Sequence, residues 1–152
     1  MHSGDFRLRP YTDADEAAVI ELWRRSWQAI YPAIDFAARV AWWRERWRGD
    51  LAAKARIVVA EADGAILGFV TIEAATGYLD QLVVAPEAWG QGIGEPLLDE
   101  ARRIAPAGIE LLVNTDNDRA IRFYRKHGFI IAGADVNPVS GRPVHRMRWK
   151  PG

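Results

Sequence analysis

The sequence contains no cysteine among its 152 residues. This absence excludes a disulfide framework, a thiolate zinc site and a catalytic cysteine. Histidine is scarce as well, and His2, His127 and His145 lie far apart along the chain without the spacing of metal ligands. We therefore expect no metal site, and the lack of cysteine is compatible with a reducing compartment.

Net charge is also lacking, because 20 lysines and arginines balance 20 aspartates and glutamates. A protein that binds nucleic acid or a membrane surface normally carries a basic excess, so neither partner is expected. No apolar run approaches the roughly 20 residues that span a bilayer. The first residues, MHSGDFRLRPY, hold no apolar signal core. The sequence thus predicts a cytoplasmic protein.

The composition is that of a globular protein, with 49% hydrophobic and 26% charged residues. A chain of this length fits one domain, and no repeat, low-complexity tract or linker interrupts it. We expect a single domain over residues 1–152.

Hydrophobic periodicity divides the chain into strands and helices. The order β-α-α-β-β-β-α-β-α-β-β predicts an α/β fold built on one mixed sheet, mostly antiparallel, with helices on both faces. Two strands joined by a helical crossover, at residues 78–84 and 109–113, should be parallel. The other strands are expected at residues 6–9, 57–61, 65–73, 129–132 and 143–149, and the helices at 13–30, 35–48, 94–104 and 117–126.

Local signals place the ends of several elements. Thr12 or Asp13 caps the first helix, with Glu16 as the capping-box partner of Asp13. Gly49 ends the second helix, and the dipeptide Asp63-Gly64 predicts a tight hairpin turn.

The first two helices carry five of the seven tryptophans. The residues Trp23 and Trp27 are four apart, as are Trp43 and Trp47, so each pair lies on one helical face. Core packing is the favoured interpretation, and an aromatic wall beside a substrate is the alternative. The arginines of this region indicate a solvated face, or a pocket for a carboxylate or phosphate: Arg24, Arg25, Arg39, Arg44, Arg46 and Arg48.

A glycine-rich turn follows the strand at 78–84. Gly90, Gly92 and Gly94 separate that strand from the next helix. A strand, a glycine turn and a helix N-terminus form a nest of backbone N–H groups that suits a phosphate or diphosphate. No Gly-Lys-Ser/Thr follows, so the turn is not a Walker loop. An ordinary tight turn is the alternative.

A second motif lies in the helix at 117–126. Asn117, Ala120 and Tyr124 have the spacing i, i+3, i+7, which places all three on one helical face. Asn117 is positioned either to cap the helix or to present its amide to a ligand.

Together the two motifs resemble those of the GNAT superfamily of acetyl-coenzyme A-dependent N-acetyltransferases. The resemblance covers about residues 57–149 and extends to the N-terminus through the order of elements. It implies a central parallel pair of strands that splay apart around a coenzyme thioester. It also implies direct transfer of an acetyl group from acetyl-coenzyme A, the co-substrate, to a primary amine in a ternary complex.

The resemblance assigns roles to particular residues. In the family the strand pairs with the pantetheine arm and the glycine turn holds the diphosphate, while Asn117 contacts the pantetheine arm and Tyr124 is the general acid for the departing thiolate. Trp89 stands where members often have Gln or Arg. The residues implied to bind the coenzyme are Leu82, Val83, Val84, Trp89, Gly90, Gln91, Gly92, Ile93, Gly94, Asn117 and Tyr124.

The general base is less defined by the motifs. Several family members carry an acidic residue at the position of Asp80, so Asp80 is the first candidate, either as base or as a holder of the substrate ammonium. Glu73 and His145 are the reserve candidates. Glu95, in the first turn after the glycines, should point to solvent because it would repel a phosphate. The 3′-phosphate of the coenzyme is assigned to Arg122, Arg125 or Lys126, with exposed helix charges as the default interpretation.

Other functions remain open at this stage. One is an acyl-coenzyme A sensor or interaction module without turnover, and another is an unrelated phosphate binder that uses only the glycine turn. The acceptor is a small amine, an amino acid, an antibiotic or a protein N-terminus. A homodimer through the last strands is expected by analogy alone.

Overall fold

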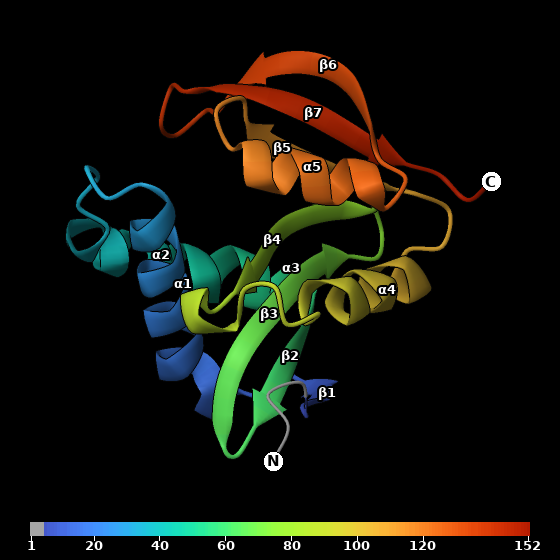
Figure 1. Ribbon diagram of the computed structural model, residues 1–152. Helices are drawn as coiled ribbons and strands as arrows, with labels where there is room; N and C mark the ends of the chain where they lie inside the picture. The colour runs from blue at the N-terminus through green and yellow to red at the C-terminus, as the bar shows by residue number, and fades with distance from the viewer. Residues whose placement is uncertain (1–4) are drawn as a thin grey trace.

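The computed structural model describes residues 5–152, so His2 lies outside the described residues (Figure 1). Seven strands form one sheet in the order β1-β2-β3-β4-β5-β7-β6. Every neighbouring pair is antiparallel except β4 and β5, as predicted. The strands are β1 (Arg7–Pro10), β2 (Arg56–Ala62), β3 (Ala65–Glu73), β4 (Tyr78–Val84), β5 (Ile109–Asn114), β6 (Ile130–Val136) and β7 (Pro143–Trp149).

Helices cover both faces of this sheet. Gly68 and Phe69 are neighbours on β3 and therefore face opposite sides. Gly68 lies against Ile93 and Leu97, whereas the Phe69 ring packs on Trp47. The α-helices are α1 (Glu16–Ile30), α2 (Val40–Arg46), α3 (Ala52–Lys54), α4 (Gly94–Ile104) and α5 (Asp118–Lys126). Short helical turns are Asp13–Asp15, Ala37–Arg39, Trp47–Leu51 and Pro86–Ala88.

The predicted second helix is the element that differs most from expectation. It is not one helix over 35–48, because a 3₁₀ turn precedes α2 and a π-helical turn, Trp47–Leu51, continues the chain into α3. Gly49 therefore lies inside a helical segment and does not end it. The wider π turn leaves both Trp47 and Leu51 buried, and this packing outweighs the local stop signal.

The capping box at the start of the chain uses a different acid from the one predicted. Thr12 is the cap and Asp15 is its partner, with the Thr12 N–H donating to Asp15 Oδ2 at 2.9 Å. Glu16 instead accepts from Arg48 at 2.5 and 2.8 Å. The Asp63-Gly64 turn is confirmed, since both residues have positive φ angles of 52° and 78°.

Three of the seven tryptophans belong to the buried core. Trp23 stacks on Trp43 at 4.7 Å between ring centroids, and both are buried together with Trp47. Trp27 is half-buried and packs against this core from its edge, whereas Trp42 is 42% exposed. Core packing is thus confirmed for Trp23, Trp43 and Trp47.

Strand β4 departs from regular pairing in two places. Its register with β3 shifts between Thr71 and Ile72, which leaves Asp80 as the extra residue of a β-bulge. On its other side, the one register pair with β5 in the described residues joins Tyr78 to Glu110. Beyond that pair the two strands splay apart, as the fold prediction required.

Candidate active site

The open edge of β4 faces the gap that the splay creates. The Gln81 N–H donates to Thr71 Oγ1 at 3.0 Å and the Ala85 N–H to Leu67 O at 2.7 Å, so these odd-numbered residues bond toward β3. Backbone groups alternate along a strand, so those of Leu82 and Val84 point the opposite way, toward β5. Leu82 and the Val84 N–H therefore offer polar backbone groups to an added strand-like ligand. The Val84 carbonyl already accepts from Trp89 Nε1–H at 2.9 Å, and the Val83 side chain is buried in the core.

The glycine turn continues this open edge. Gly90 and Gly92 have φ angles of 79° and 77°, which L-amino acids with a side chain rarely adopt. Added Cβ atoms there would meet nothing within 4 Å, so the turn is uncrowded. Gly94 begins α4 and serves a different purpose, because a Cβ at this position would lie 3.2 Å from the Phe123 ring. The turn thus presents backbone N–H groups at the N-terminus of α4, and Glu95 is exposed as expected.

Asn117 and Tyr124 both lie on the inward face of α5, each 8% exposed. Asn117 caps the helix, since its Oδ1 accepts from the Ala120 N–H at 3.2 Å. Its side-chain N–H₂ group is left for a further acceptor. Burial raises the pKa of Tyr124 well above the ordinary value of a phenol, so the hydroxyl carries its proton throughout the neutral range.

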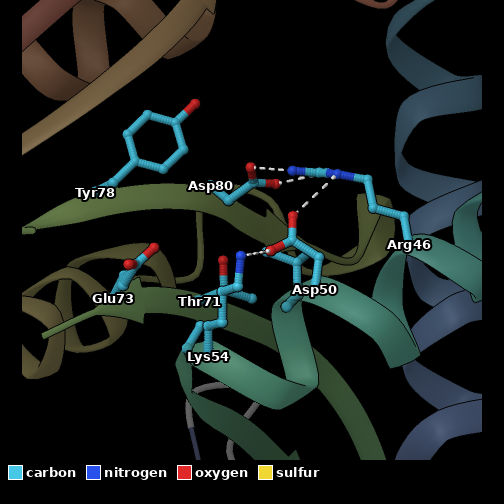
Figure 2. A pocket seen from close by; sticks show the side chains of 9 residues that line it. Arg46, Asp50, Lys54, Thr71, Glu73, Tyr78 and Asp80 are labelled. Carbon is cyan, nitrogen blue, oxygen red and sulfur yellow. Dashed lines mark hydrogen bonds and ion pairs between the residues drawn. The ribbon is translucent and has the colours of Figure 1, made fainter. Parts of the chain in front are cut away.

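Asp80 is held by an arginine that the sequence did not single out. Arg46 Nη1 and Nη2 donate to Asp80 Oδ2 and Oδ1 at 2.9 and 2.5 Å (Figure 2). Gln81 Nε2 also donates to Oδ2 at 3.1 Å. A carboxylate has about four acceptor sites, so Oδ1, with one donor, keeps a lone pair free. Arg46 therefore does not belong to a solvated face, which corrects one part of that interpretation.

Arg46 and Asp80 border a cavity of about 100 Å³ at the base of the splay. Its lining carries charges of both signs, with three carboxylates and two cations (Figure 2). Burial and the nearby Asp80 charge raise the pKa of Tyr78 to about 12. The reserve base Glu73 lines the same cavity, whereas His145 lies on β7, opposite Val113 and two strands away from β4. The lining residues are Arg46, Asp50, Leu51, Lys54, Ala55, Thr71, Glu73, Tyr78 and Asp80.

A second polar group joins the end of α1 to the loops beyond β5 and β6. The Tyr31 hydroxyl donates to Asp116 Oδ1 at 2.7 Å and accepts from Asn114 Nδ2 at 3.0 Å. Arg142 donates to Asp116 Oδ2 at 2.9 Å and its guanidinium lies 4.6 Å from the Tyr31 ring centroid. We call Tyr31, Asn114, Asp116 and Arg142 the Tyr31 cluster. It connects α1, which packs on β4, with the end of β5, and so it bounds the gap on the α1 face.

The sequence could not have revealed these partners. Arg46 and Asp80 are 34 residues apart, and Tyr31 and Asp116 are 85 apart. Neither pair belongs to a local motif.

Comparison with known proteins gives the same fold and the same family. The model of the acetyltransferase (GNAT) family matches residues 17–129. The peptidyl-lysine N-acetyltransferase YjaB of Salmonella typhimurium is 34% identical over 127 residues, which cover 82% of this chain and 83% of that protein. The PaiA N-acetyltransferase of Thermoplasma acidophilum, solved in complex with coenzyme A, aligns with a TM-score of 0.73 at 24% identity, covering 97% of this chain and 99% of that chain.

A third relative is longer than this chain. The mycothiol acetyltransferase of Kineococcus radiotolerans is 34% identical over 146 residues, which cover 88% of this chain but 46% of that protein. The chain therefore spans about half the length of this relative.

The splayed sheet, the glycine turn and these matches together define the class of this protein as an acetyltransferase. With the family model matching most of its length, the chain belongs to the GNAT acetyltransferase family. It is an N-acetyltransferase whose co-substrate is acetyl-coenzyme A. In the described residues, no helix is both long and apolar enough to span a bilayer.

Proposed function

We propose that this enzyme transfers the acetyl group directly from acetyl-coenzyme A to a primary amine while both are bound. The observation that carries the proposal is the open edge of β4, where Leu82 and Val84 face the gap directly before the glycine turn. Leu82–Val84 pair with the pantetheine arm as an added strand would, and Asn117 donates its free amide to it. The turn residues Gly90, Gln91, Gly92, Ile93 and Gly94 hold the diphosphate.

Tyr124 supplies a proton to the departing sulfur. When bound, acetyl-coenzyme A supplies a thioester carbon that forms a bond to the amine nitrogen as the bond to sulfur breaks. Tyr124 suits the role of acid because its buried hydroxyl is protonated at neutral pH. The proposal is supported by the position of Tyr124 on the same buried face of α5 as Asn117, with each residue 8% exposed.

Asp80 accepts the proton that the amine must lose. Arg46 keeps the carboxylate fixed, and the free lone pair of Oδ1 takes the proton directly or through a water. Glu73 is second in rank because it lines the same cavity from β3. His145 is last, since it lies two strands away from β4.

The acceptor class that we infer is a lysine side chain of a peptide or protein. The relative that matches most of both chains is named a peptidyl-lysine N-acetyltransferase. Glu73 lines the cavity without an ion-pair partner among residues 5–152, whereas Asp80 is paired with Arg46 and Asp116 with Arg142. An unpaired carboxylate such as that of Glu73 attracts an ammonium group.

The second candidate acceptor is the one that a mycothiol acetyltransferase uses. It is favoured by the mycothiol acetyltransferase of Kineococcus radiotolerans, which matches 88% of this chain. A peptide N-terminus is the third.

Thiol release from acetyl-coenzyme A, followed with a panel of amines, tests the proposal. We expect the highest kcat/KM for a lysine peptide with a blocked N-terminus. A preference for the same peptide with a free N-terminus and a blocked lysine, or for an amino sugar, would replace the acceptor class. Binding of the coenzyme without thiol release for any amine would favour the sensor that the sequence left open.

A further inference from the structure

Arg119, in the first turn of α5, lies beside the glycine turn and has no acidic partner among residues 5–152. Its guanidinium carbon is 4.0 Å from the centroid of the Trp89 ring, and Trp89 directly precedes Gly90. The described structure has five such cation–ring contacts, and this one is the shortest. Arg119 thus bridges α5 to the loop that leads into the turn.

The charge of Arg119 is not neutralised by a carboxylate. Desolvation lowers the pKa of Arg119, and no acidic group in residues 5–152 raises it again. Other arginines near the gap are paired, Arg25 with Glu87 and Arg46 with Asp80. A cation that is partly desolvated but unpaired is stabilised by an anion that arrives from outside.

The Arg119 guanidinium makes no hydrogen bond within residues 5–152, so its donors are available. A guanidinium that lies on a ring uses its flat face, while its N–H groups point outward in the plane and match a phosphate in bidentate fashion. Trp89 itself has no donor left for a ligand, because its Nε1–H donates to Val84 O at 2.9 Å. That bond fixes the indole at the end of β4, so the ring is a rigid support for the guanidinium.

We propose that Arg119 donates to the diphosphate of acetyl-coenzyme A, with the Trp89 indole holding its guanidinium beside the glycine turn. The inference rests on the proposed function, which places the diphosphate at that turn. It assigns the diphosphate one side-chain cation in addition to the backbone N–H groups. Arg122, Arg125 and Lys126 of the same helix, to which the sequence assigned the 3′-phosphate, are exposed as Arg119 is, but Arg119 alone of the four contacts the Trp89 ring.

Calorimetric titration with three ligands tests the assignment without any acceptor. The ligands are coenzyme A, 3′-dephospho-coenzyme A, which keeps the diphosphate, and pantetheine, which lacks every phosphate. For Arg119→Gln we expect the affinity for the first two to fall equally, by about 10- to 100-fold. Pantetheine should bind as it does to the unmodified enzyme. The matched control is Arg103→Gln, which removes an exposed arginine paired with Glu100 near the end of α4 and should change none of the three affinities.

Each other pattern would overturn the assignment. A loss confined to coenzyme A would move Arg119 to the 3′-phosphate, and an equal loss for all three ligands would make its role structural. No loss at all would remove it from the site. Trp89→Ala should reproduce the Arg119→Gln pattern, while Trp89→Phe, which keeps a ring face, should retain most of the affinity.

A failure of the proposed function gives a different result. If the diphosphate binds elsewhere, Gly92→Ala will leave the affinity for coenzyme A unchanged, whatever Arg119→Gln does. If both variants lose affinity for coenzyme A but not for pantetheine, the result supports both the diphosphate site at the glycine turn and the role of Arg119.

Discussion

Single residues of this site are tuned by what surrounds them. The phenol of Tyr124 is buried on the inner face of α5, and burial raises its pKa. Asp80 is fixed by two bonds from Arg46. The first residue therefore holds a proton firmly, and the second stays in one orientation with a lone pair to spare. Tyr124 and Asp80 are the proposed donor and acceptor for the two proton transfers that acetylation of an amine requires.

Tyr124→Phe removes the proposed acid and little else. No hydrogen bond of the Tyr124 hydroxyl is found among residues 5–152, so the melting temperature should stay within a few degrees of that of the unmodified enzyme. We expect kcat to fall by about 10² to 10⁴, with the KM for acetyl-coenzyme A nearly unchanged. Steady-state kinetics and a thermal scan check both parts. Unchanged turnover would exclude Tyr124 as the acid.

Asp80→Asn tests the proposed base. At neutral pH we expect a large fall in kcat, because the lysine amine, with an ordinary pKa of about 10.4, is then bound as an ammonium. Activity should recover as the pH rises toward that value, since the amine then loses its proton to solvent. Glu73→Gln is the matched comparison and should show a smaller fall. If Asp80→Asn has the pH profile of the unmodified enzyme, Asp80 only holds the substrate.

Elements fix where these residues lie. The β-bulge turns Asp80 out of the β3–β4 ladder, the splay frees Leu82 and Val84, and the glycine turn joins them to the N-terminus of α4. Two glycines of the turn are required for different reasons. At Gly92 the backbone conformation requires it, while at Gly94 the approach of Phe123 requires it.

Gly92→Ala should strain the turn without filling it. The φ angle of 77° costs an alanine about 1–2 kcal/mol, and the turn should relax by moving its N–H groups. We expect the KM for acetyl-coenzyme A to rise several-fold. Gly49→Ala is the control, because Gly49 lies in a helical segment where a Cβ meets nothing within 4 Å. That change should stabilise the fold by about 0.5–1 kcal/mol and leave the KM unchanged. If Gly92→Ala and Gly49→Ala have the same KM for acetyl-coenzyme A, the glycine turn does not hold the coenzyme.

The junction of β1 and α1 should depend on pH. Hydrogen bonds from Arg9 lower the pKa of Asp15 from 3.8 to about 2. A lowered pKa contributes stability above the ordinary value, and the contribution is lost as the pH falls from about 4 to 2. Asp15→Asn should therefore reduce the free energy of unfolding at pH 7 by about 1–2 kcal/mol, and the difference should vanish near pH 2. Urea unfolding at both pH values measures the difference in the free energy of unfolding. The same difference at pH 7 and at pH 2 would show that it does not come from the lowered pKa of Asp15.

Across the whole molecule, the sequence predicted what local patterns encode. The bounds of β3, β4 and β7 follow from periodicity and from the turns beside them, and all three agree with the structure. The predicted end of the second helix at Gly49 was wrong, because burial of Trp47 and Leu51 keeps the chain helical as far as Lys54. The partners Arg46 and Asp116 could not be found, since contacts between distant segments leave no local pattern. The roles of the coenzyme-binding residues, Asp80 and Tyr124 stay predictions.

The homodimer also stays a prediction, at the scale of the assembly. Strand β6 is at the edge of the sheet, with Ile130 64% and Val136 57% exposed. Unpaired apolar edges favour pairing with a second copy. Sedimentation velocity at micromolar concentration should show a dimer that Ile130→Lys converts to a monomer. A monomer at every concentration would contradict it.

The most direct test of the account is a crystal structure of this enzyme with acetyl-coenzyme A bound. We predict that the diphosphate lies within hydrogen-bond distance of the Gly90, Gly92 and Ile93 N–H groups, that the pantetheine arm pairs with Leu82 and Val84, and that the sulfur lies beside the Tyr124 hydroxyl. A coenzyme bound outside the gap between β4 and β5, or a sulfur remote from Tyr124, would contradict the central claim.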